Sequence, residues 1–128
     1  MAKNYYQKNK YHAMTIEVNG EKFDSIREYR RWGQLQMLLE QGKIYDLQRQ
    51  VKFILIPTQR EPDTVGKRGG VIKGKLLEKE CSYLADFTYH IPGSDKLIVE
   101  DTKGMRTTDY IIKRKLMLYI HGIQIKEL

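Results

Sequence analysis

The stretches YLADFTY (residues 83–89) and LIVEDTKG (residues 97–104) have the composition of β-strands, and acidic residues interrupt both. Aromatic and β-branched residues favour strands. Pro92-Gly93-Ser94, which lies between the two stretches, is typical of a turn. The sequence therefore predicts that these stretches form neighbouring strands of one sheet.

The acidic residues of these strands form a candidate metal site. Side chains alternate between the two faces of a strand, so Asp101 shares a face with Lys103, whereas Glu100 shares the other with Thr102. In a hairpin, Asp86 can lie opposite Asp101. Two nearby carboxylates repel each other unless a cation lies between them, and their oxygens suit Mg²⁺ or Mn²⁺. The alternative is a pair of surface acids at strand ends.

The rest of the chain predicts further elements around this pair. In chain order we expect a hairpin over 15–23 around Asn19-Gly20, a helix over 25–41, a strand over 44–56, strands over 81–90 and 96–103, a helix over 107–121 and a strand over 123–126. The order predicts an α/β protein with a mixed sheet flanked by helices. We expect one domain over 1–128, with a flexible basic arm over 1–13 and a basic loop or weak hairpin over 58–79.

The first predicted helix carries an acid on its apolar stripe. Glu28, Trp32, Leu35 and Leu39 fall on one side at helical spacing. An acid on a buried face is unusual without a partner. Glu28 is therefore a candidate third carboxylate, although it also fits a capping box with Ser25.

The second predicted helix carries a lysine within its apolar face. That face is predicted to consist of Ile111, Ile112, Leu116, Leu118 and Tyr119. Lys115 projects from its middle, where its head group either reaches the edge of the face or contacts a phosphate beside the acids.

Charge and cysteine content narrow the classes of function. The chain has 23 Lys and Arg against 16 Asp and Glu, a net charge of +7, which favours a polyanionic partner such as nucleic acid. The single cysteine, Cys81, excludes an internal disulfide and a zinc site of several cysteines. We expect no membrane partner and a cytoplasmic location, since the sequence has neither a long apolar run nor a secretory signal.

The motifs together resemble a known superfamily. Asp86, followed by Asp101-Thr102-Lys103 and preceded by Glu28 on a helix, is similar to the PD-(D/E)xK nucleases, which include Holliday junction resolvases and transposon-end nucleases. Over residues 11–127 the chain resembles more closely a phage-borne family of uncharacterised nuclease-like proteins. The stretches that carry this likeness are Phe23-Asp-Ser25 with Glu28, Leu84-Ala-Asp-Phe87, Val99-Glu-Asp-Thr-Lys-Gly104 and Lys113-Arg-Lys-Leu116.

The resemblance implies a restriction-endonuclease-like core and a metal-dependent DNA endonuclease, phage or prophage encoded. Asp86, Asp101 and the main-chain carbonyl of Thr102 would bind Mg²⁺ or Mn²⁺, and Glu28 would hold a second ion or a metal-bound water. Lys103 would orient the attacking water or stabilise charge on the phosphate. Ala85 stands where the superfamily name has proline, a change that many members share.

The resemblance also implies residues that contact DNA. Gln48 and Gln50 would position the scissile phosphate, unless they are ordinary exposed polar residues of a strand. Cations would hold backbone phosphates without reading sequence. They are Lys67, Arg68, Lys73, Lys75, Arg106, Lys113, Arg114 and Lys115.

Three functions remain open on the sequence. The first is an endonuclease acting on branched DNA, with DNA ends as the second substrate, in phage recombination or DNA processing. A resolvase must cut two strands symmetrically, so that function implies a homodimer. The second is a non-catalytic DNA-binding protein that retains the nuclease fold. The third is an RNA-binding or interaction protein that uses the tyrosine-rich arm, which leaves the acidic cluster without a role.

Overall fold

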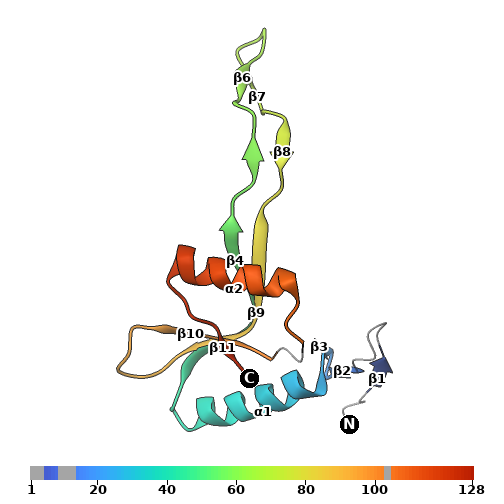
Figure 1. The fold of residues 1–128 in the computed structure, drawn as a ribbon, viewed down its shortest axis with the longest axis vertical. Helices are drawn as coiled ribbons and strands as arrows, with labels where there is room; N and C mark the ends of the chain where they lie inside the picture. Colours follow the sequence, from blue (N-terminus) through green and yellow to red (C-terminus); the bar gives the residue numbers. More distant parts are fainter. Residues whose placement is uncertain (1–4, 9–13, 103–104) are drawn as a thin grey trace. The chain divides into compact units, whose positions relative to one another are not determined.

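The chain folds into two helices, a four-stranded sheet and several small hairpins (Figure 1). The structure is a computed structural model and describes residues 5–8, 14–102 and 105–128. The elements are β1 (Tyr5–Lys8), β2 (Met14–Val18), β3 (Glu21–Phe23), α1 (Ile26–Glu40), β4 (Tyr45–Ile56), β5 (Gln59–Arg60), β6 (Thr64–Val65), β7 (Val71–Ile72), β8 (Leu76–Glu78), β9 (Cys81–His90), β10 (Leu97–Asp101), α2 (Thr108–His121) and β11 (Lys126–Glu127). The fold is therefore mixed α/β, as predicted.

The chain divides into two compact units. The first unit comprises Met1–Val51, Ala85–Met105 and Ile125–Leu128, and the second comprises Lys52–Leu84 and Arg106–Gln124. Strands β4 and β9 each continue from one unit into the other.

The four-stranded sheet has the order β11-β10-β9-β4. Strand β10 pairs antiparallel with β9 and parallel with β11, so the sheet is mixed. The last strand begins at Lys126, three residues later than the predicted strand over 123–126.

The predicted turn chemistry at the start of the chain is confirmed. Strands β2 and β3 pair through Val18 and Glu21, and the turn residues Asn19 and Gly20 have φ angles of 53° and 79°. Such a turn needs two residues with positive φ, which Asn-Gly supplies. Strand β1 pairs with β2, where the sequence predicts a flexible arm; the rest of that arm, residues 1–4 and 9–13, lies outside the described residues.

Helix α1 begins and ends where its capping signals predict. The Ser25 hydroxyl accepts a hydrogen bond from the Glu28 N–H at 3.1 Å, and Gly42 follows the helix with a φ of 71°. Leu35 is fully buried with Phe87 of β9, on which Trp32 stacks at 5.9 Å between ring centroids. Leu38 rather than the predicted Leu39 packs on this core. The core thus sits between α1 and the first unit's part of the sheet.

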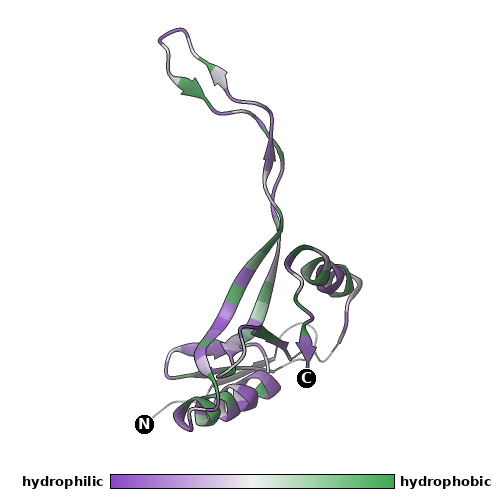
Figure 2. Cartoon of the chain, turned by 90° about the vertical axis from the view of Figure 1, so that its left-hand side faces the viewer, coloured by the Kyte–Doolittle hydropathy of each residue, from purple (hydrophilic) through white to green (hydrophobic). Residues whose placement is uncertain are grey.

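Helix α2 packs within the second unit on a face different from the predicted one. Tyr110 and Met117 are buried, and Tyr110 contacts the ring of Tyr83 in β9. Most of the predicted face is exposed, including Leu118 at 54% and Tyr119 at 88%. Both hydropathy colours appear around α2 in Figure 2. The predicted face was wrong because the contact with Tyr83 buries the side of the helix that carries Tyr110 and Met117, while Ile112, Leu118 and Tyr119 stay exposed.

Residues 58–79, which the sequence predicts to be a basic loop or a weak hairpin, form a hairpin. Strands β5 and β8 pair, and β6 pairs with β7 further along. The two arms of the hairpin approach closely at Gly74, where a Cβ would lie 1.7 Å from the Glu61 carbonyl oxygen. None of the helices in the described part is long and apolar enough to cross a membrane.

Candidate active site

The two predicted aspartates face each other across the β9–β10 pair. The register aligns Glu100 with Phe87, and its continuation by one pair sets Asp101 opposite Asp86. Asp101 is almost completely buried, and Asp86 is half-buried. The Oδ2 atom of Asp86 accepts hydrogen bonds from both the N–H and the hydroxyl of Thr102, each at 2.8 Å. Thr102 therefore fixes one carboxylate oxygen of Asp86 at the end of β10.

Glu100 points toward α1 and binds other partners. Its two carboxylate oxygens accept hydrogen bonds from Arg31 Nε at 2.7 Å and Arg31 Nη2 at 2.8 Å. The Tyr89 hydroxyl also donates to Glu100. These bonds raise the pKa of Arg31, and burial together with Glu100 raises the pKa of Tyr89 to about 12. A carboxylate held by a bidentate ion pair has little capacity for a metal, which leaves Asp101 as the acid beside Asp86.

Glu28 enters the same unit from the first turn of α1. It is 2% exposed, and its carboxylate accepts hydrogen bonds from the Asp24 N–H at 3.1 Å and Gln50 Nε2 at 3.0 Å. Arg49 Nη2 lies 3.5 Å from the Oε1 atom. The pKa of Glu28 is raised to about 7, first by burial and then by the negative charge of Asp86. That interaction places Glu28 within electrostatic reach of the aspartates.

Gln50 reaches Glu28 through an unusual backbone. Its φ is 53° although it lies within β4, a conformation that few residues other than glycine adopt. Backbone strain of this kind tends to collect at functional sites. Gln48, by contrast, is exposed and bonds to Asp46, whose backbone also has a positive φ. Of the two glutamines, only Gln50 therefore joins the acidic site.

The oxygen atoms of the two aspartates are of the type that binds divalent ions. Two carboxylates on adjacent strands, Asp86 and Asp101, offer the oxygen ligands that Mg²⁺ and Mn²⁺ prefer. Within the described ranges, no three Asp, Glu, His or Cys side chains are grouped closely enough to hold a metal. Glu28 is thus not brought together with both aspartates as a three-acid cluster. The carboxylate pair Asp86 and Asp101 fits the oxygen preference of a divalent ion, whereas the part played by the Thr102 carbonyl remains a prediction.

A family described as "Protein of unknown function (DUF1064)" matches residues 8–126 of the chain. The chain belongs to the DUF1064 family. Comparisons with curated proteins and with solved structures find no match. The family description assigns no chemistry, so function has to be inferred from the residues themselves.

Several predicted site residues lie elsewhere in this DUF1064 chain. Lys103 lies outside the described residues, and its role remains a prediction. The predicted DNA-binding cations fall in the second unit. Lys67 and Arg68 lie in the exposed turn between β6 and β7. The remaining cations are exposed Lys73 and Lys75 beside the hairpin strands, exposed Arg106 before α2, half-buried Lys113 and Arg114 on α2, and exposed Lys115 on α2.

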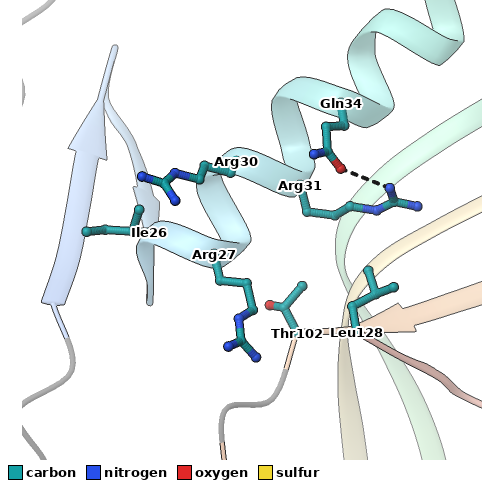
Figure 3. Close-up of a pocket in the computed structure, with 7 residues that line it drawn as sticks. All are labelled: Ile26, Arg27, Arg30, Arg31, Gln34, Thr102 and Leu128. Atoms are coloured by element: carbon teal, nitrogen blue, oxygen red, sulfur yellow. Dashed lines mark hydrogen bonds between the residues drawn. The ribbon is translucent and has the colours of Figure 1, made fainter.

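A cluster of arginines on α1 is missing from the residues predicted by sequence. Arg27, Arg30 and Arg31 line a pocket of about 580 Å³ together with Ile26, Gln34, Thr102 and Leu128 (Figure 3). Their spacing of three and four residues places their Cα atoms near one another along the first turns of the helix, a signal that is present in IREYRR. The prediction missed them because apolar periodicity, rather than charge, defined the face of this helix.

Proposed function

We propose that the chain is a metal-dependent endonuclease that hydrolyses phosphodiester bonds in DNA, with a restriction-endonuclease-like site of the PD-(D/E)xK type. The observation that carries the proposal is Asp101, buried at the end of β10 and opposite Asp86, whose carboxylate is held by Thr102. Two carboxylates so placed repel each other, and a divalent cation between them removes that repulsion.

Each residue of the proposed site would have a separate role in the reaction. A bound Mg²⁺ or Mn²⁺ would activate water and stabilise the charge that builds on phosphorus. Asp86 and Asp101 would hold that ion. Glu28, whose pKa is about 7, can exchange a proton with water near neutral pH. Gln50 orients Glu28, and Lys103 would stabilise charge on the phosphate.

The net charge of +7 and a sequence without a recognised base-reading motif favour a nuclease that selects DNA structure rather than sequence. Branched DNA, as in phage recombination, is the first proposed substrate class, and DNA ends are the second. A four-way junction would require a symmetric dimer. Such an activity would act in the cytoplasm of the host cell.

The proposal is tested by cleavage of labelled duplex, single-stranded, flapped and four-way DNA with Mg²⁺, with Mn²⁺ and with EDTA. Cleavage is expected with either ion and not with EDTA. Asp86→Asn and Asp101→Asn should each lower the rate by more than about 100-fold, because even outer partners of metal ligands cost about 10–100-fold. Lys103→Ala should lower the rate more than the affinity for metal.

Asp95→Asn is the matched control for these variants. Asp95 is an exposed residue between β9 and β10, and its substitution makes the same change in charge. It should leave cleavage unchanged. Full activity in the Asp86→Asn/Asp101→Asn double variant would refute the proposed site. Metal-independent binding of DNA without cleavage would instead indicate a DNA-binding protein that retains the fold.

A further inference from the structure

The arginine pocket on α1 has a surplus of positive charge. Arg31 is compensated by Glu100 and also donates to Gln34 at 3.1 Å. Arg27 and Arg30 are exposed and make no ion pair or hydrogen bond with any residue in the part of the chain that the structure describes. The other lining residues are Ile26, Gln34, Thr102 and Leu128, so no aspartate or glutamate side chain of the described ranges lines the pocket. The lining therefore includes two arginine side chains that no acidic side chain of the described residues compensates.

This arrangement costs the free protein stability. Like charges three or four residues apart on a helix repel by a few tenths of a kcal/mol per pair. Arg27 is also the second residue of α1, and cations near a helix N-terminus oppose the helix dipole. An anion in the pocket would relieve both costs. Arginine suits this purpose because its planar fork binds phosphate oxygens in pairs.

The pocket adjoins the acidic site. Thr102 lines the pocket and at the same time donates two hydrogen bonds to Asp86. Figure 3 shows the Arg27 side chain running from α1 toward Thr102, while Arg30 extends along the other side of the helix and Arg31 turns to Gln34. Thr102 is therefore shared by the pocket that Arg27 lines and by the hydrogen bonds that hold Asp86.

We propose that this pocket binds a phosphate group of the nucleic-acid strand, next to the phosphate at the acidic site, with Arg27 as its main contact and Arg30 as the second. The inference rests on the proposed function in that the ligand is a DNA phosphate. The chemistry is shared by an internal phosphodiester, which carries one negative charge, and a terminal phosphate monoester, which carries up to two. An internal phosphate would serve to fix the register of the strand, and a terminal one would make the chain recognise DNA ends.

The test measures DNA binding in EDTA, so that it does not depend on cleavage. The probes are two labelled duplexes of the same sequence, one with 5′-phosphates and one with 5′-hydroxyls. The variant is Arg27→Gln/Arg30→Gln. The control is Lys43→Gln/Lys96→Gln, which removes two charges from exposed lysines of the same unit that do not line the pocket.

The arginine variant should bind about tenfold more weakly than the control, since loss of a charged hydrogen bond is worth about that factor. The plot of log affinity against log salt should become shallower, its slope decreasing in magnitude by about 0.9 for each phosphate that the variant no longer binds. An equal loss of affinity on both probes identifies an internal phosphate, and a loss only on the 5′-phosphorylated probe identifies a terminal one. A folded arginine variant that binds both probes like the control, or wild-type protein that binds neither, overturns the inference.

The two proposals fail separately. If the wild type cleaves DNA with Mg²⁺ but the arginine variant binds like the control, the pocket inference is wrong and the nuclease proposal stands. If the arginine variant weakens binding but no cleavage occurs, the nuclease proposal is wrong and the phosphate pocket stands. The variant is expected to stay folded, because exposed arginines contribute little to the core, and circular dichroism and thermal unfolding test this.

Discussion

Glu28 is both part of the cap of α1 and a buried side chain with a raised pKa. Its main-chain N–H is capped by Ser25, as the capping box predicts, but its carboxylate bonds to the Asp24 N–H and to Gln50. Burial raises its pKa to about 7, so the residue is ionised only in part at neutral pH. The sequence could not separate a helix-capping glutamate from a glutamate at the acidic site, because Ser25 followed by Glu28 fits the capping box in either case.

The raised pKa predicts a specific pH dependence for Glu28→Gln in the metal-free protein. The folded state holds the Glu28 proton more tightly than the unfolded state does. The stability that this proton provides is complete below the unfolded pKa and is lost as the pH rises through about 7. As the pH is raised from about 5 to about 8, wild type loses this stability and Glu28→Gln does not. The free energy of unfolding of the variant minus that of wild type should therefore increase by up to about 3 kcal/mol.

Urea unfolding of both proteins in EDTA at these two pH values measures the change. The comparison of wild type with variant cancels the titration of all other groups that do not contact Glu28. An equal difference in stability at both pH values would show that the pKa of Glu28 is not raised by burial.

Helix α1 and strand β10 are joined by a buried ion pair. Arg31 holds Glu100 with two short hydrogen bonds, and the Glu100 side chain has no exposed surface. The same pair fixes the face of β10 that Glu100 occupies and so turns Asp101 to the other face. Local alternation predicted that separation, but only the helix identified the partner of Glu100.

Arg31→Met is expected to destabilise the protein by about 3–5 kcal/mol, because it leaves the Glu100 carboxylate buried without its counter-charge. Replacing both residues, as Arg31→Met/Glu100→Leu, should cost much less than the sum of the two single variants. Denaturant unfolding of the four proteins in a double-mutant cycle measures the coupling. Additive effects would show that the pair contributes no interaction energy. Glu100→Gln should keep metal-dependent cleavage, unlike Asp101→Asn.

Positive charge is distributed over both compact units of the chain. The first unit carries the arginine pocket, and the second carries the cations of the hairpin and of α2. A net charge of +7 favours release of counterions when DNA binds. Binding of DNA should therefore depend on charges that lie far apart in the sequence.

We expect affinity for DNA to fall steeply as salt is raised. Lys67→Gln/Arg68→Gln, at the turn between β6 and β7, should reduce the slope of log affinity against log salt by up to about 2, since one bound phosphate contributes about 0.9. Asp101→Ala should bind at least as tightly as wild type, since it removes a negative charge near phosphate. Fluorescence anisotropy across a salt series measures both. An unchanged slope in the hairpin variant would exclude the β6–β7 turn from the DNA interface.

Sequence was sufficient for features that depend on neighbours along the chain. Ser25 caps α1, Asn19-Gly20 turns the first hairpin, and Gly122 ends α2 with a φ of 65° because hydrogen bonding and backbone preference act within a few residues. The alignment of Asp86 with Asp101 follows from two strands joined by a turn. Mixed α/β architecture follows from the order of these elements.

Other features required the tertiary structure, because they depend on which surfaces meet. The buried face of α2 is set by Tyr83, which covers Tyr110, so the most hydrophobic stripe of that helix stays exposed. Gln50 adopts a positive φ that no local signal marks. Arg27 and Arg31 lie one helical turn apart on α1, and no local signal distinguishes them. Glu100, 69 residues from Arg31 in the chain, neutralises Arg31 and not Arg27. Long-range burial and charge pairing thus separate the arginine that supports the fold from the one left to bind an anion.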